Sequence, residues 1–218
     1  MKVSCAQPWL AADLGAPHQV LSWCPYRPGL VLAERILWRE VRNADLTEEF
    51  DAETWLAEEV AGQGAAPAVC FLTSRDIRHH HYRKVTVEGV TVEALATVGL
   101  GNIEAVGSRR AAPPASYGTI NIAVQVHAAL SQSAQLEALS IITEARTAAI
   151  LAEGHQLPGG IASGTGTDCI ALASAQTGPE LAFAGLHTAL GEAIGRAVLE
   201  AVSEGARTEQ ISLAQAAR

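Results

Sequence analysis

Apolar and polar residues alternate along several short stretches of the chain, which is the pattern of strands that bury one face. The clearest run is 120–126, where isoleucine or valine occupies every second position. Alternating residues from Val85 to Val98, with Glu88 and Gly89 at the join, predict a hairpin. Apolar runs predict further strands at 68–73, 169–173 and 181–184, and two or three more at one side of the domain within residues 1–43.

Three other stretches carry apolar residues at helical spacing. Asp51 is placed to cap a helix over 52–61, and Ser131 or Ser133 to cap a long helix that ends at Gly154. A last helix begins near His187 and Thr188. Strand pairs with short turns and three long helices predict an α+β fold, a single domain over residues 1–218. We expect a mixed or mainly antiparallel sheet with the helices packed against it.

Charge and cysteine content narrow the class of protein. The 218 residues include 15 Lys and Arg against 23 Asp and Glu, a net charge of -8, so we expect no nucleic-acid partner. The four cysteines are widely spaced, and Cys70 and Cys169 lie in apolar runs, which favours a reducing compartment. No apolar run reaches signal-peptide or membrane-helix length, so we expect a cytoplasmic protein without membrane contact.

The glycine-rich loop from Pro158 to Gly166 has the most unusual local composition in the chain. It lacks the lysine of a phosphate-binding loop and leads into a strand, so a phosphate site is disfavoured. Its backbone N–H groups, with Thr165, Thr167 and Asp168 nearby, suit an oxyanion or a polar ligand. A plain surface turn explains the same composition.

Two histidine-containing segments have functional and structural interpretations. His187 lies at a strand-to-helix junction, where a helix N-terminus keeps an imidazole neutral and able to accept a proton. A hydrogen-bonded structural histidine is the alternative. Gly191 and Gly195 indicate that something approaches the last helix closely, either a ligand or the sheet. The run His79-His80-His81 reads as a solvated loop, because adjacent histidines do not point at one ion.

Five blocks in order resemble the motif series of the adenosylcobinamide amidohydrolase family. They are Thr97-Val98-Gly99-Leu100-Gly101-Asn102, Gly118-Thr119-Ile120-Asn121-Ile122, Thr143-Glu144-Ala145-Arg146-Thr147-Ala148-Ala149, Gly164-Thr165-Gly166-Thr167-Asp168 and Ala184-Gly185-Leu186-His187-Thr188-Ala189-Leu190-Gly191-Glu192. The resemblance covers about residues 65–205. It implies hydrolysis of the amide that joins the corrin ring side chain to aminopropanol, giving adenosylcobyric acid in cobamide salvage. The implied partner is a small-molecule corrinoid, with no cofactor, and a homo-oligomer is compatible with it.

Amide hydrolysis needs a nucleophile, donors for the oxyanion and a proton for the leaving amine. Catalytic candidates are His187, Asp168 and Glu144, and substrate-binding candidates are Asn102, Asn121, Gly164, Thr165, Gly166, Thr167, Thr188 and Glu192. Thr165 or Thr167 as the nucleophile is a second option. A metal held by His187 with Asp168 or Glu144 is a third, but no paired-histidine spacing supports it, so we expect no metal.

The chain departs from the family pattern at a few positions. Ala189 stands where a lysine commonly follows the His-Thr pair, Ser108 stands where an acid is common, and Arg27-Pro28-Gly29 replaces an Asn-Gly-Gly-like turn. If these positions bear on the chemistry, they favour a corrinoid-binding protein of the same fold without turnover. A structural or regulatory domain of this fold is the more remote alternative.

Overall fold

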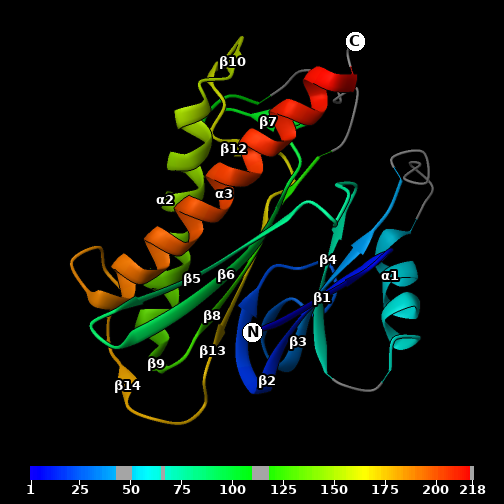
Figure 1. The fold of residues 1–218 in the computed structure, drawn as a ribbon. Coiled ribbons are helices and arrows are strands. Elements are labelled where there is room, and N and C mark those ends of the chain that lie inside the picture. The colour runs from blue at the N-terminus through cyan, green and yellow to red at the C-terminus, as the bar shows by residue number, and fades with distance from the viewer. Residues whose placement is uncertain (43–50, 65–66, 110–117, 217–218) are drawn as a thin grey trace.

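The computed structural model describes residues 1–42, 51–64, 67–109 and 118–216, with side chains through residue 210. Its centre is an eight-stranded sheet in the order β4-β3-β2-β13-β8-β6-β5, with β1 paired to β2 (Figure 1). The strands are β1 (Lys2–Ala6), β2 (Trp9–Ser22), β3 (Gly29–Glu40), β4 (Ala68–Thr73), β5 (His80–Val87), β6 (Val90–Val98), β8 (Ile120–Val126) and β13 (Cys169–Ser174). The β3–β4 and β13–β8 pairs are parallel and the others antiparallel, which confirms an α+β fold with a mixed sheet.

Three helices lie on this sheet within the described residues: α1 (Ala52–Ala61), α2 (Gln132–Glu153) and α3 (Ala189–Ala216). Two of the predicted N-caps are confirmed, because Asp51 accepts from the Thr54 N–H at 3.1 Å and Ser131 from the Ala134 N–H at 3.0 Å. Gly154 ends α2 in the left-handed conformation. None of these described helices combines the length and apolar content needed to cross a membrane.

Six short strands form separate two-stranded pairs around the main sheet. They are β7 (Ile103–Glu104) with β12 (Gly164–Thr165), β9 (Ala129–Leu130) with β14 (Glu180–Leu181), and β10 (Gln156–Leu157) with β11 (Gly160–Ile161). The glycine-rich loop is therefore partly paired, since β12 binds β7. The strand predicted over 181–184 is shorter than expected, because its pairing with β9 ends at Leu181.

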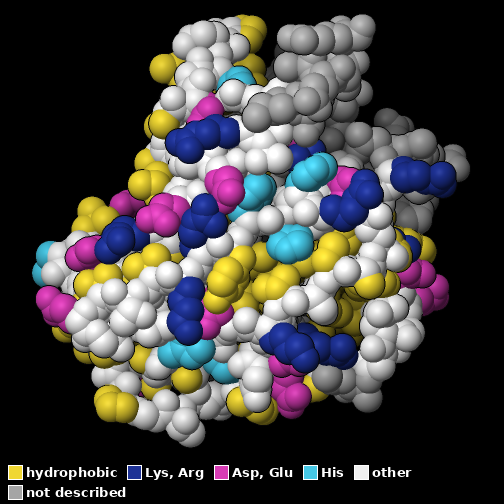
Figure 2. Space-filling view, in the orientation of Figure 1, with side chains coloured by type: hydrophobic (Ala, Val, Ile, Leu, Met, Phe, Trp, Pro, Cys, Tyr) yellow, Lys and Arg dark blue, Asp and Glu magenta, His cyan; other side chains and the backbone are white. Residues whose placement is uncertain are grey.

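The prediction of a loop over His79-His80-His81 is wrong from His80 onward, because β5 begins at that residue. The strand extends this far because α3 packs over it: the His81 imidazole faces Glu204 of α3, with Nδ1 and Oε2 3.5 Å apart. Arg83 also pairs with Glu204 and with Glu200. On the face seen in Figure 2, basic and acidic side chains are accordingly mixed over α3 and β5.

The sheet buries a core on each face. Residues such as Ile122 and Val124 of β8 face α2 and α3, whereas α1 covers β3 and β4 at the other end of the sheet (Figure 1). The opposite face curls around an inner core that contains Trp38 and Phe71, whose ring centroids are 4.7 Å apart. The curl brings β8 back to β4, four places away in the sheet order, and leaves an open end where β8 and β13 begin.

Candidate functional site

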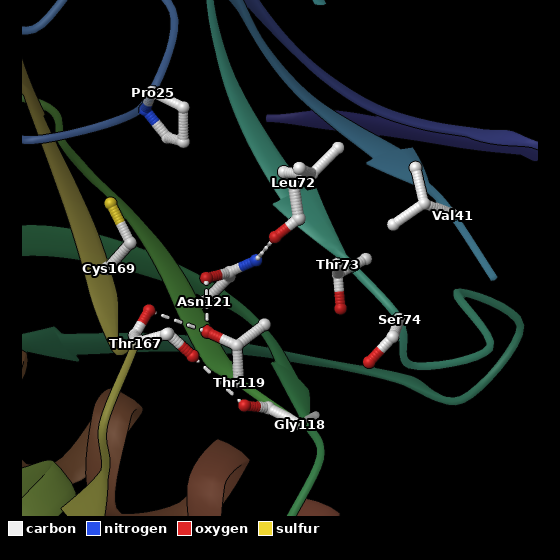
Figure 3. Close-up of a pocket in the computed structure, with 10 residues that line it drawn as sticks. All are labelled: Pro25, Val41, Leu72, Thr73, Ser74, Gly118, Thr119, Asn121, Thr167 and Cys169. Atoms are coloured by element: carbon white, nitrogen blue, oxygen red, sulfur yellow. Dashed lines mark hydrogen bonds between the residues drawn. The ribbon is translucent and has the colours of Figure 1, made fainter. Parts of the chain in front are cut away.

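A cavity of about 200 Å³ lies at the open end of the curled sheet (Figure 3). Its wall combines the end of β4, the beginnings of β8 and β13 and the segments beside them: Pro25, Val41, Leu72, Thr73, Ser74, Gly118, Thr119, Asn121, Thr167 and Cys169. Because β8 and β13 are parallel, with Asn121 opposite Cys169, both strands begin at this end. The wall is apolar on one side and carries hydroxyl and amide groups on the other.

Hydrogen bonds tie the polar side of the wall together across three strands (Figure 3). The Asn121 side-chain N–H donates to the Leu72 carbonyl oxygen of β4 at 3.0 Å. The Thr119 hydroxyl lies 2.8 Å from the Thr167 carbonyl oxygen and 3.1 Å from the Asn121 Oδ1. Thr167 in turn donates its hydroxyl proton to the Gly118 carbonyl oxygen at 3.0 Å. The polar groups are therefore held in fixed positions before any ligand enters.

Asn102 supports this wall from behind. It is 4% exposed, and its side-chain N–H donates to the Thr167 Oγ1 at 3.3 Å while its Oδ1 accepts from the Gly118 N–H at 3.2 Å. A side chain on Gly118 would collide with the backbone of Gly99 and Gly101, so these two glycine segments pack directly against each other. Asn102 is thus a positioning residue, since its amide is used within the protein.

Asp168 holds the loop that ends in the cavity wall. Its carboxylate accepts from the Thr165 hydroxyl at 2.6 Å, the Thr165 N–H at 3.0 Å and the Ile120 N–H at 3.2 Å, and it pairs with Arg146 of α2. Burial raises the pKa of Asp168, although Arg146 and Thr165 oppose that rise. A side chain on Gly164 would collide with Arg146 and Asp168, which explains that glycine.

The second region singled out from the sequence lies at the start of α3. The Thr188 hydroxyl donates to the Gly185 carbonyl oxygen at 2.8 Å and accepts from the Gly191 N–H at 2.9 Å, so Thr188 caps the helix. The interpretation that Gly191 leaves room for a ligand is wrong, because a Cβ there would meet the carbonyl oxygens of Ala184 and Gly185. His187 itself is exposed.

The two regions contact α2 at points about two and a half turns apart. Arg146 binds Asp168, whereas Glu137 accepts from the Ala184 N–H at 2.7 Å, nine residues earlier on the same helix. At 1.5 Å per residue, Glu137 and Arg146 are about 13 Å apart along the axis of α2. The Asp168 carboxylate binds Ile120, Thr165 and Arg146, and none of its hydrogen bonds within the described residues goes to His187.

The structure brings seven of the predicted site residues to the cavity end and leaves four elsewhere. The seven are Asn102, Asn121, Gly164, Thr165, Gly166, Thr167 and Asp168, with the Gly166 N–H bonded to the Asn102 carbonyl oxygen at 3.2 Å. His187, Thr188 and Glu192 lie at the start of α3, and Glu144 is exposed on α2. Glu192 faces Arg196 on the surface of α3, 3.6 Å away.

Sequence reasoning missed several residues at the cavity end. Thr73 ends the buried strand β4 and Ser74 follows it, a position that could have indicated both residues. Arg146 belongs to one of the five sequence blocks, but its ion pair with Asp168 is visible only in the structure. No three His, Cys, Asp or Glu side chains in the described ranges come close enough to share a metal ion.

Comparison with known proteins places the whole pattern in one family. The PH0078 protein from Pyrococcus horikoshii OT3 is similar over 90% of this chain and 76% of its own, with 11% identity and a TM-score of 0.44, a likeness too weak to support a functional conclusion. No curated protein matches significantly. The model of the family described as adenosylcobinamide amidohydrolase matches residues 1–213. The chain therefore belongs to the adenosylcobinamide amidohydrolase family.

Proposed function

We propose that the protein hydrolyses the amide between the corrin side chain and aminopropanol in adenosylcobinamide, releasing adenosylcobyric acid and aminopropanol. Family membership over residues 1–213 supports an amidohydrolase acting on this substrate. The observation that carries the proposal is the cavity at the start of β8 and β13. Pockets that enclose whole drug-sized ligands have volumes of roughly 300–1,000 Å³. A cavity of about 200 Å³ suits the aminopropanol arm and its amide, with the corrin ring outside.

The polar wall of the cavity matches the needs of an amide. The hydroxyls of Thr119 and Thr167 and the carboxamide of Asn121 lie on the side where β8 and β13 begin. Groups fixed in advance stabilise a developing oxyanion better than mobile ones, because they need no reorganisation during the reaction. The hydroxyl protons of Thr119 and Thr167 are donated within the protein, so we assign the polarisation of the substrate carbonyl to the second side-chain N–H of Asn121. The hydroxyl oxygens of the two threonines can accept the amide N–H of the substrate. Asp168 and Asn102 hold the residues of this wall in place.

The nucleophile is a water molecule or the Thr167 hydroxyl. A threonine nucleophile forms an acyl-enzyme in which the corrin side chain is esterified to the protein. Replacing Thr167 with Val removes the hydroxyl but keeps the shape. If water attacks, the variant retains slow turnover. If Thr167 attacks, turnover ceases and no acyl-enzyme forms.

A corrinoid-binding protein without turnover is the second candidate. One observation favours it: the described lining of the cavity contains no His, Asp or Glu, the side chains that usually transfer protons in hydrolysis. This candidate predicts tight binding of adenosylcobinamide with no products.

The experiment is incubation of the purified protein with adenosylcobinamide, with adenosylcobyric acid and free aminopropanol measured by mass spectrometry. Both products must accumulate in equal amounts for the proposed function to stand. Binding without products, measured by equilibrium dialysis, identifies the binding protein. Absence of both binding and products contradicts both candidates.

A further inference from the structure

Two cysteines lie opposite each other at the wall of the cavity. The β2–β13 ladder pairs Ser22 with Ala171, and the same antiparallel register continued by two residues places Cys24 opposite Cys169. Both side chains belong to the same buried core. The strands stay together beyond the ladder, because the Trp23 indole N–H donates to the Asp168 carbonyl oxygen at 2.9 Å.

This geometry falls within the range of a disulfide. Directly opposed residues of antiparallel strands have Cα atoms about 4.5–5.5 Å apart, and disulfides join residues whose Cα atoms are about 4.4–6.8 Å apart. Cys24 and Cys169 also share the inner core, whereas Cys70 belongs to the separate core under α1. The four cysteines are free thiols in the structure.

The position of the pair gives it access to small solutes. Cys24 is 1% exposed and Cys169 is 5% exposed, so neither meets bulk solvent or another protein. Cys169 nevertheless lines the cavity, and so does Pro25, the residue after Cys24. A molecule the size of hydrogen peroxide that enters the cavity therefore reaches the Cys169 sulfur.

We propose that Cys24 and Cys169 form a reversible disulfide that switches off the cavity. Hydrogen peroxide converts the Cys169 thiol to a sulfenic acid and releases one water molecule. The Cys24 sulfur then attacks the Cys169 sulfur, forming the S–S bond and releasing a second water molecule. A dithiol reverses the change by thiol–disulfide exchange.

The bond alters the cavity because it changes one wall. It turns the Cys169 side chain toward β2 and ties the segment before Pro25 to β13, beside Thr167. Its effect on turnover rests on the proposed function, whereas its formation does not. The neighbouring Cys24 thiol and burial both raise the pKa of the Cys169 thiol, so the reactive thiolate is scarce at neutral pH and oxidation accelerates as pH rises.

The test uses the full chain carrying Cys5→Ala, because Cys5 is exposed and would cross-link molecules. The protein is treated with hydrogen peroxide, digested without reduction and mapped by mass spectrometry, and hydrolysis of adenosylcobinamide is measured before treatment, after it and after dithiothreitol. We expect a peptide pair joined through Cys24 and Cys169, at least a tenfold loss of turnover, and recovery on reduction.

Matched variants isolate the pair. Cys24→Ala gives no cross-linked peptide, whereas Cys70→Ala, which replaces a buried thiol in the other core, cross-links as the parent does. Absence of the cross-link in the parent overturns the inference, and a cross-link with unchanged turnover overturns the switch. If the reduced parent shows no turnover, the proposed function fails, and the mapping still decides whether the disulfide forms.

Discussion

The two ends of the β8–β13 pair contain the two most distinctive sequence blocks, yet they use their polar residues differently. At the cavity end, Asp168, Thr167 and Asn121 bond to other strands and form a wall. At the other end, Thr188 bonds only to neighbours in the chain, and His187 is exposed beside it. A family motif therefore identifies membership, but only the geometry indicates which block faces a cavity.

The largest expected effect comes from Asp168→Asn, which leaves Arg146 buried without its counter-charge. Breaking one partner of a buried ion pair costs about 3–5 kcal/mol, and the two side chains here are 9% and 14% exposed. Urea denaturation measures the loss. Glu192→Gln, at the helix end, breaks an exposed pair and should change stability by less than about 0.5 kcal/mol. Equal losses in the two variants would contradict the difference between the ends.

Glycine substitutions separate structure from binding. Gly118→Ala and Gly191→Ala each place a methyl group against backbone, and each should destabilise the fold by about 1–3 kcal/mol. At a temperature where both variants stay folded, we expect only Gly118→Ala to weaken corrinoid binding, because Gly118 lines the cavity. Equilibrium dialysis decides. Weaker binding in Gly191→Ala alone would move the site to the start of α3.

Thr167→Val should lower kcat/KM by about tenfold to a hundredfold, the effect of removing a hydroxyl that positions the amide, and should abolish turnover if Thr167 is the nucleophile. Folding stability should fall by about 1–3 kcal/mol, because the change removes the partner of the buried Asn102 N–H and of the Gly118 carbonyl oxygen, so kinetics are measured where the variant stays folded. Thr177→Val, in an exposed turn beyond β13, is the matched control. The cavity assignment fails if both variants hydrolyse adenosylcobinamide at the wild-type rate.

His187→Ala should change kcat/KM by less than about twofold, since His187 is exposed at the start of α3 and does not line the cavity. The sequence alone favours the opposite, a hundredfold loss from a removed acid–base group. Steady-state kinetics on a folded variant measures the difference. A hundredfold loss in kcat would return the chemistry to the helix end.

Exhaustive chelation should have the smallest effect, with kcat/KM unchanged. A metal shared by His187 and Asp168 would need these side chains to lie close together, but their regions contact α2 at separate points, Glu137 and Arg146. The measurement is turnover after dialysis against a chelator, with metal content checked by mass spectrometry. Loss of turnover that a divalent ion restores would contradict the prediction.

Local features were readable from the sequence. Asp51 and Ser131 were identified as N-caps because a cap bonds within its own first turn, and the Glu88-Gly89 turn joins its hairpin as expected. Hydrophobicity alone does not identify the buried face of α2, since Leu136 is 60% exposed. Alanines such as Ala138 and Ala145 fill the inner face instead, because small side chains let α2 lie close to its neighbours.

Long-range features were not readable. The partners of the Asp168 carboxylate come from β8, β12 and α2. No local sequence pattern pairs Arg146 with that carboxylate. His187 and Asp168, both catalytic candidates, lie apart because β13 follows Asp168 and carries the chain to the other end of the sheet. Thr73 reaches the cavity only because the sheet curls, which brings β4 to β8.

The hydrogen bond from Asn121 to the Leu72 carbonyl oxygen makes the cavity a meeting point of strands that are distant in the sequence. A bound molecule there contacts only the folded chain and so shifts the folding equilibrium by mass action. At a concentration 100 times its dissociation constant, it adds about 2.7 kcal/mol to stability. Proteolysis acts mainly on opened chains, so we expect a ligand that binds this cavity to slow the degradation of the protein.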